Sequence, residues 1–148
     1  MNNGLYSSIS CEWETPQDFF DKLNAKWRFT LDVCATAENA KCDKFFTRDD
    51  DGLLQTWKGR CWMNPPYGRE IGKWMKKAYE STKTEAECVV CLVPARTDTA
   101  WFHDYAMKGR IEFIRGRLRF GGGNNPAPFP SCVVTFERED NSDRDDRG

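Results

Sequence analysis

The apolar residues of this chain fall into short runs that are separated by amphipathic stretches, as in folds that alternate strands with helices. Runs rich in apolar and β-branched residues predict strands at residues 29–35, 44–47, 60–63, 87–94, 110–115 and 131–137. Because helical patterns separate most of these runs, the chain is predicted to have an α/β fold with an open, mostly parallel sheet.

Three stretches predict helices, and residues 37–44 form either a short helix or a loop. One helix is expected to start with Thr15 as N-cap and Pro16 at its first position. Another covers residues 98–108 and starts at Asp98. The third covers residues 70–81, where the apolar residues have the spacing of one helix face: Ile71, Trp74, Met75, Ala78 and Tyr79.

The two ends of the pattern are distinctive. No helix separates the last two predicted strands, so they should form an antiparallel pair, with the final strand antiparallel to the rest of the sheet. The whole pattern fits one domain over residues 1–136. Residues 137–148 contain six acidic and three basic residues and no apolar residue after Phe136, which predicts a disordered charged tail.

Composition excludes several classes of protein. No apolar run approaches the ~20 residues of a membrane helix, and the polar start is unlike a signal peptide. We therefore expect a soluble, cytoplasmic protein with no membrane partner. Cys88 and Cys91 have the spacing of a redox or zinc pair, but their apolar strand favours buried, reduced thiols. His103 is the only histidine, and no metal is expected.

The most informative motif is Asn64-Pro65-Pro66-Tyr67, which directly follows the predicted strand 60–63. The Asn64 side-chain oxygen and the Pro65 carbonyl can accept the hydrogens of an exocyclic amine and draw its nitrogen toward sp3 geometry. The prolines stiffen this acceptor edge, and Tyr67 offers a flat face on which a base can stack. The alternative for these four residues alone is a proline-stiffened turn.

Acidic residues follow two earlier predicted strands. In an open α/β sheet, ligands bind beyond the carboxyl ends of the strands, where Asp32, residues 49–51 and Asn64 should converge. The glycine-rich phosphate-binding fingerprint is absent. This pattern disfavours a dinucleotide or ATP and leaves a nucleoside cofactor without phosphates.

An ordered set of motifs resembles the S-adenosylmethionine-dependent DNA N6-adenine methyltransferases, particularly the small phage and prophage Dam-like group. The matching residues are 13–16, 31–35, 51–53, Trp57, 64–67, 92–102, 116–120 and 128–131. The resemblance implies a Rossmann-like methyltransferase sheet, S-adenosylmethionine as cofactor and methyl transfer to adenine N6 in DNA. One departure is the turn after Asp32, which lacks the several glycines usual in the wider superfamily.

The resemblance also implies residue roles. An acid among residues 49–51 would hold the cofactor ribose or adenine, with Asp51 favoured and Asp50 next. The other implied cofactor residues are Thr15, Pro16, Asp32, Cys34 and Ala35. The catalytic set would be Asn64, Pro65, Pro66 and Tyr67. No covalent cysteine intermediate is needed, because the sulfonium is already a good leaving group.

DNA is the expected partner, and the target base must be flipped out of the duplex. The stripe Arg110, Arg115, Arg117 and Arg119 is the candidate for phosphate contact, with a solvated strand face as the alternative. The chain has no room for a separate target-recognition domain. Sequence recognition would then come from loops or from a second subunit of a homodimer, or it would be loose. We favour loose recognition.

Two other functions remain open at the level of sequence. The motif at Asn64 also serves enzymes that methylate protein glutamine, and related motifs serve RNA adenine methylation. A non-catalytic nucleic-acid-binding relative is the alternative from another class, and the intact motif argues against it.

Overall fold

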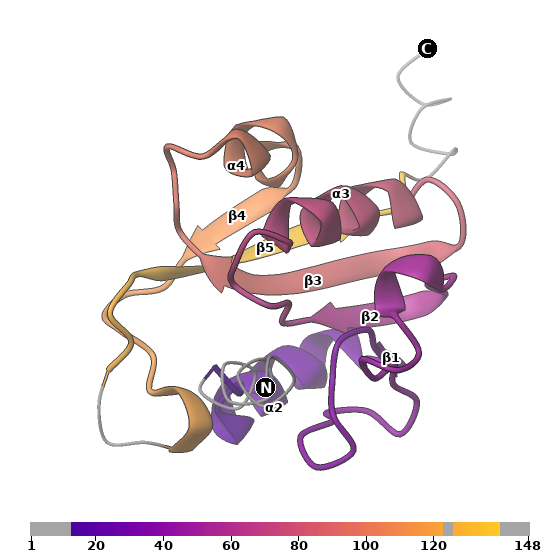
Figure 1. Cartoon of the computed structure of the whole chain (residues 1–148), viewed down its shortest axis with the longest axis horizontal. Helices are drawn as coiled ribbons and strands as arrows, with labels where there is room; N and C mark the ends of the chain where they lie inside the picture. The colour runs from indigo at the N-terminus through magenta and orange to yellow at the C-terminus, as the bar shows by residue number, and fades with distance from the viewer. Residues whose placement is uncertain (1–12, 123–125, 140–148) are drawn as a thin grey trace.

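The computed structural model describes residues 13–122 and 126–139 and has a sheet with helices on both faces (Figure 1). Its strands are β1 (Leu31–Asp32), β2 (Gly59–Met63), β3 (Ala86–Pro94), β4 (Arg110–Phe113) and β5 (Ser131–Glu137). Its helices are α2 (Gln17–Trp27), α3 (Ile71–Ser81) and α4 (Ala100–Asp104), with 3-10 turns η1 (Gly52–Leu54), η2 (Ala106–Lys108) and η3 (Phe120–Gly122).

The five described strands lie in the order β1-β2-β3-β5-β4. β1, β2 and β3 pair in parallel, and β5 lies antiparallel between β3 and β4. Four of these strands therefore run in one direction and β5 runs against them. This confirms the predicted α/β class, the mostly parallel open sheet and the antiparallel final strand.

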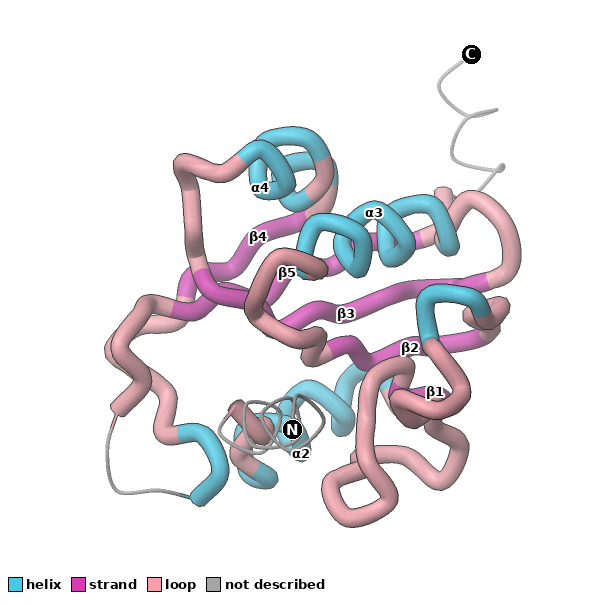
Figure 2. The backbone as a smooth tube through the Cα atoms, viewed as in Figure 1, coloured by secondary structure: helices cyan, strands magenta, loops and turns pink. Residues whose placement is uncertain are grey.

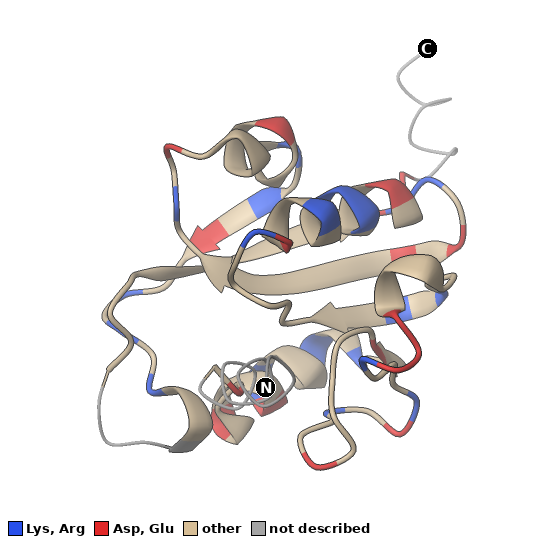
Figure 3. Cartoon of the chain, viewed as in Figure 1, with Lys and Arg blue, Asp and Glu red and all other residues tan. Residues whose placement is uncertain are grey.

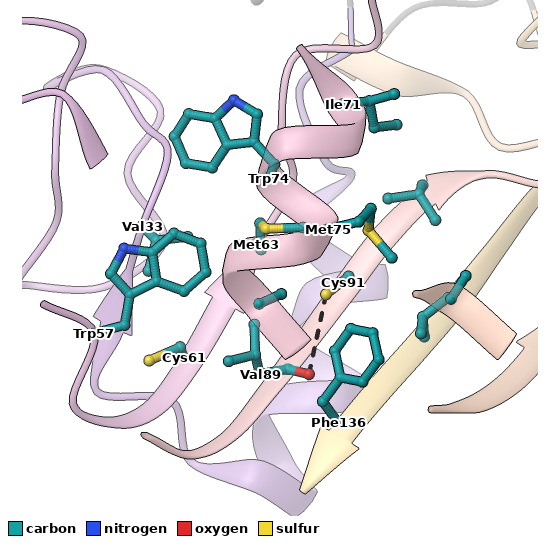
Figure 4. Packing of buried hydrophobic residues seen from close by; sticks show 14 of the residues in the cluster. Val33, Trp57, Cys61, Met63, Ile71, Trp74, Met75, Val89, Cys91 and Phe136 are labelled. Atoms are coloured by element: carbon teal, nitrogen blue, oxygen red, sulfur yellow. Dashed lines mark hydrogen bonds between the residues drawn. The ribbon is translucent and has the colours of Figure 1, made fainter. Parts of the chain in front are cut away.

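The core has two layers because side chains of a strand alternate between faces. On β3, Val89, Cys91 and Val93 belong to one cluster with Met75 of α3 and Phe102 of α4, and Figure 4 shows Val89 and Cys91 on the side of the sheet that α3 covers. Cys88, Val90 and Leu92 belong to the cluster with Phe20 of α2 on the other face. Cys88 and Cys91 consequently point to opposite sides of the sheet and are free, buried thiols, as the apolar strand around them predicted.

Several predicted elements are shorter than expected. β1 has only two residues, because the backbone turns directly after Asp32, where the Cys34 N–H donates to the Asp32 carboxylate at 3.2 Å. The predicted strand 44–47 is reduced to one bridge at Phe45. The segment between β1 and β2 is loop apart from η1 (Figure 2).

The predicted helix boundaries also shift. Residues 98–108 divide into α4 and η2, because Tyr105 leaves the helical region of backbone space. Thr99, not Asp98, precedes α4. α2 begins at Gln17 with Pro16 as its N-cap residue, so Thr15 lies before the helix instead of capping it, and its hydroxyl bonds elsewhere.

The segment predicted as a charged tail begins inside the sheet. Glu137 is the last residue of β5, and the Arg138 N–H donates to the Glu87 carbonyl at 2.9 Å. The rest of the predicted tail, residues 140–148, lies outside the described residues, as do residues 1–12 and 123–125. Among the described helices, none has the length and apolar character needed to span a membrane.

Candidate active site

A cavity of about 490 Å³ opens at the carboxyl ends of β1 and β2. Its walls come from residues 13–15, from the turn after β1, from residues 46–48 and 51–53, and from residues 64–66 after β2. The sidedness of parallel strands explains this convergence. The structure therefore brings together the three strand-end motifs that the sequence predicted to meet.

Asp32 organises the turn that forms one wall. Its side chain is buried, and its two carboxylate oxygens accept from the Cys34 N–H at 3.2 Å and the Lys41 N–H at 3.0 Å. Burial raises the pKa of Asp32 to about 6, against the lowering effect of these two bonds. At neutral pH the carboxylate is charged and holds the turn closed around itself.

Cys34 lines the cavity as a neutral thiol. Burial, followed by the nearby Asp32 charge, raises the pKa of Cys34 to about 12. A thiol is a nucleophile only as the thiolate. Cys34 therefore lines the cavity as a neutral group and not as a nucleophile.

The acidic loop separates into residues that reach the cavity and residues that do not. Asp51 lines the cavity and has a left-handed backbone with φ 54°. Its Oδ1 accepts from the Leu53 N–H at 3.2 Å. The Asp50 carboxylate instead accepts from the Thr47 N–H at 2.8 Å and the Thr47 hydroxyl at 3.1 Å. Geometry thus favours Asp51 as the cavity acid.

Gly52 makes this position of Asp51 possible. A Cβ on Gly52 would lie 2.4 Å from the Val33 carbonyl oxygen and 2.9 Å from the Trp74 ring, so no larger residue can lie there without moving the backbone. The Trp57 indole N–H donates to the Gly52 carbonyl at 2.8 Å. Trp57 also stacks on Trp74 with ring centroids 6.0 Å apart (Figure 4).

This support was missed at the level of sequence. Gly52 and Trp57 stood within the matching motifs but had no assigned role, and Trp74 was predicted only as an apolar helix residue. Phe46 and Leu53 add apolar surface to the cavity; Phe46 was predicted only as a strand residue, and Leu53 stood within a matching motif without an assigned role. Their contribution depends on loop packing, for which the sequence has no periodic pattern.

Asn64 follows β2 and lines the same cavity. Its side-chain nitrogen donates to the Trp13 carbonyl at 2.7 Å and to the Thr15 hydroxyl at 3.0 Å. Its Oδ1 is buried and has no hydrogen-bond partner among the described residues. A buried acceptor without a donor costs about 1–3 kcal/mol, so this oxygen is a ready acceptor for a ligand N–H.

Tyr67 lies in an aromatic cluster beside the cavity. Its hydroxyl donates to the Leu92 carbonyl at 3.0 Å, and burial raises its pKa well above the usual value. The Trp13 ring lies nearly parallel to Tyr67 at 6.3 Å, while Phe120 and Phe129 meet it edge-on. Stacking of a base on Tyr67 stays a prediction, and it requires space that Trp13 now covers.

The predicted cofactor residues do not all reach the cavity. Thr15, Asp32, Cys34, Ala35 and Asp51 line it, whereas Pro16 and Asp50 do not. Pro16 instead accepts a backbone bond from Phe20 at the start of α2. Of the predicted catalytic residues, Asn64, Pro65 and Pro66 line the cavity.

The arginine stripe is divided. Arg110 is the first residue of β4. Its guanidinium pairs with the Glu137 carboxylate at 3.3 Å, and it lines a separate hollow of about 700 Å³. Arg115, Arg117 and Arg119 lie in the loop that follows the last residue of β4. The chain length from Arg110 to Arg115 is about 16 Å at 3.3 Å per residue. Lysine and arginine residues gather in this loop and on α3 (Figure 3).

The chain is similar in sequence to known proteins over most of its length. Residues 5–147 match the model of a family described as DNA N-6-adenine-methyltransferase (Dam). The protein of that name from Haemophilus phage HP1 is 30% identical over 137 residues, which cover 84% of this chain and 78% of that protein. Its counterpart from Escherichia phage T1 is 29% identical over 140 residues, 76% of this chain and 58% of that protein.

The chain spans little more than half the length of the phage T1 protein. Among solved structures, the 23S rRNA methyltransferase ErmE has a TM-score of 0.56 over 86% of this chain and 70% of its own, at 10% identity. That likeness shows a shared fold.

Proposed function

Because this chain belongs to the DNA N-6-adenine-methyltransferase (Dam) family, we propose that it transfers the methyl group of S-adenosylmethionine to the exocyclic N6 amine of adenine in DNA. The observation that carries this proposal is the orientation of Asn64: its amide nitrogen is bonded, and its buried oxygen has no donor among the described residues.

The cavity suits S-adenosylmethionine in size and charge. Its volume of about 490 Å³ lies within the range of ~300–1,000 Å³ usual for small-molecule sites. Four carboxylates and two cationic side chains line it, which favours a ligand of net positive charge: Glu14, Asp32, Asp51 and Glu70 against Lys41 and Arg48.

Within this cavity, Asp51 is the proposed acceptor for the ribose hydroxyls. Asp32 keeps the turn with Cys34 and Ala35 in shape, and Phe46 and Leu53 provide apolar contact for the adenine ring. When bound, S-adenosylmethionine supplies an electrophilic methyl group on a sulfonium leaving group.

The proposed work at the target amine falls to residues 64–67. The Asn64 oxygen and the Pro65 carbonyl accept the two amine hydrogens and draw the nitrogen lone pair out of conjugation. Pro66 stiffens this edge, and Tyr67 bounds the base pocket. The amine held in this way would take up the methyl group that the bound cofactor supplies, the thioether would be the leaving group, and one amine hydrogen would leave as a proton to solvent. Alignment of the reacting atoms supplies much of the rate.

The loop after β4 is the proposed site of phosphate contact, through Arg115, Arg117 and Arg119, and we propose that sequence recognition is loose. Arg110 is left out of this surface, because it pairs with Glu137. A catalytic domain over residues 1–136 that acts on DNA in the cytoplasm of a host cell completes the proposal.

Methyl transfer to DNA, RNA and protein measured in parallel tests the proposed substrate. The full chain is incubated with methyl-labelled S-adenosylmethionine and equal masses of duplex DNA, structured RNA and a protein extract. We expect label in DNA at least tenfold above the other two. Label that accumulates in RNA or in protein instead would overturn the choice of substrate.

A further inference from the structure

The amide of Asn64 can take two orientations that differ by a half-turn and have nearly the same shape. Only one of them turns the oxygen, and not the NH₂ group, toward a target amine. The proposed reaction therefore depends on what selects between the two orientations.

The acceptors that select the orientation come from one segment about fifty residues away in the chain. The Trp13 carbonyl lies 2.7 Å from the Asn64 nitrogen, and the Thr15 hydroxyl oxygen lies 3.0 Å from it. A backbone carbonyl can only accept. A reversed amide would place its oxygen against the Trp13 oxygen, so two acceptors would repel each other.

The Thr15 hydroxyl has no competing structural role at the helix start. Thr15 is 3% exposed, and its position before Pro16 is one where threonine often caps a helix. However, the N-cap residue of α2 is Pro16, so Thr15 lies one residue before the cap position. In the described residues, the hydroxyl bond that the structure records for Thr15 is the one from Asn64.

The segment is itself held in place from two directions. The Trp13 ring packs edge-on against Phe129 at 4.9 Å and Phe120 at 5.6 Å. The Glu14 carbonyl accepts from the Gly121 N–H at 2.8 Å. These contacts fix both acceptors relative to Asn64.

We propose that Thr15 is a positioning residue for methyl transfer: its hydroxyl, together with the Trp13 carbonyl, holds the Asn64 amide with the oxygen toward the target amine. This role rests on the proposed function. It differs from the cofactor contact that the family resemblance implies for Thr15, because it acts on turnover and leaves cofactor affinity unchanged.

The test compares Thr15→Val, which keeps the shape and removes the hydroxyl, with Thr15→Ser, which keeps the hydroxyl. We expect Thr15→Val to lower kcat about tenfold, with KM for DNA and Kd for S-adenosylmethionine within twofold of wild type. Thr15→Ser should stay within threefold of the wild-type kcat. Thr82→Val removes another buried threonine hydroxyl, bonded to the Tyr79 carbonyl, and should leave kcat unchanged.

A double-mutant comparison shows whether Thr15 acts through Asn64. Adding Thr15→Val to Asn64→Ala should cause no further loss of the residual activity. In the ¹⁵N spectrum, the side-chain NH₂ signal that disappears in Asn64→Ala should shift in Thr15→Val and keep its position in Thr82→Val.

Two outcomes would overturn the inference: an unchanged kcat in Thr15→Val, whether or not the cofactor Kd is raised, or equal losses of kcat in the valine and serine variants. Failure of the proposed function can be distinguished from failure of the inference about Thr15. If the wild-type chain methylates no DNA, the NH₂ signal still reports whether Thr15 holds the Asn64 amide.

Discussion

The two halves of the active-site cavity are built in different ways. The half around Asp32, Asp51 and Gly52 is fixed by backbone N–H groups, by a glycine pressed against Val33, and by core tryptophans. The half around Asn64 is fixed by a distant segment through side-chain bonds and aromatic contacts. We expect the first half to determine cofactor affinity and the second to determine turnover.

The largest effect on the first half is expected from Asp51→Asn. Loss of a charged hydrogen bond to the cofactor, worth about 1.5–3 kcal/mol, should raise the Kd for S-adenosylmethionine at least tenfold and leave kcat at saturating cofactor within threefold. Asp50→Asn is the matched control, since the Asp50 carboxylate accepts a hydrogen bond from the Thr47 N–H and Asp50 does not line the cavity. Calorimetric titration measures both, and equal Kd values in the two variants would contradict the assignment.

A smaller effect, on DNA binding, is expected from changes in the loop after β4, which carries Arg115 and Arg119. Replacing both with alanine should weaken duplex binding about fivefold. It should also reduce the slope of log K against log salt by about 1.8, at ~0.9 per phosphate contact. Arg110→Ala should leave the slope unchanged, because Arg110 pairs with Glu137. If the double variant and the wild type have the same salt slope, these two arginines do not contact DNA phosphates.

The smallest effect concerns the protonation of Asp32. As pH falls through about 6, the carboxylate takes up a proton and loses one of its two backbone N–H bonds. Cofactor affinity should therefore fall about threefold between pH 7.5 and 5.5. Asp32→Asn should show a flat profile, and parallel profiles would exclude Asp32 as the cause.

Protonation of Asp32 is expected to weaken cofactor binding but to stabilise the fold, so the two effects can be told apart. The pKa of Asp32 is raised from 3.8 to about 6 by folding, so the folded state binds the proton more tightly than the unfolded state. From this group alone, the free energy of unfolding rises as pH falls from 6 to 3.8. Lower cofactor affinity between pH 7.5 and 5.5 therefore does not come from loss of fold through Asp32, because protonation of this group stabilises the folded state.

The sequence predicted the parts of the site that follow from strand direction. Asp32 ends β1, Asn64 follows β2, and the acidic loop follows the segment that forms a parallel bridge with Asp32 at Phe45, so the three converge at one edge of the sheet. The choice between Asp50 and Asp51 could not be predicted, since it depends on one left-handed residue and on the space beside Gly52. Likewise, β4 ends at Phe113, and this separates Arg110 from the three arginines in the loop.

The contact between Asn64 and residues 13–15 was also beyond prediction. The pattern around Thr15 resembles a helix cap, and nothing periodic links it to a motif about fifty residues later. Only the packing of Trp13 on Tyr67, Phe120 and Phe129 places its carbonyl beside the Asn64 amide. Long-range side-chain bonds of this kind leave no local signature in a sequence.

The central claim is that the Asn64 oxygen accepts the target amine while the rest of the cavity holds the cofactor. Asn64→Ala, assayed for methyl transfer to DNA and for S-adenosylmethionine binding in the same preparation, tests it most directly. We predict a loss of turnover of about a thousandfold, measured as N6-methyladenine in digested DNA, with the cofactor Kd within threefold of wild type. Turnover near the wild-type value, or loss of cofactor binding equal to the loss of turnover, would contradict the account.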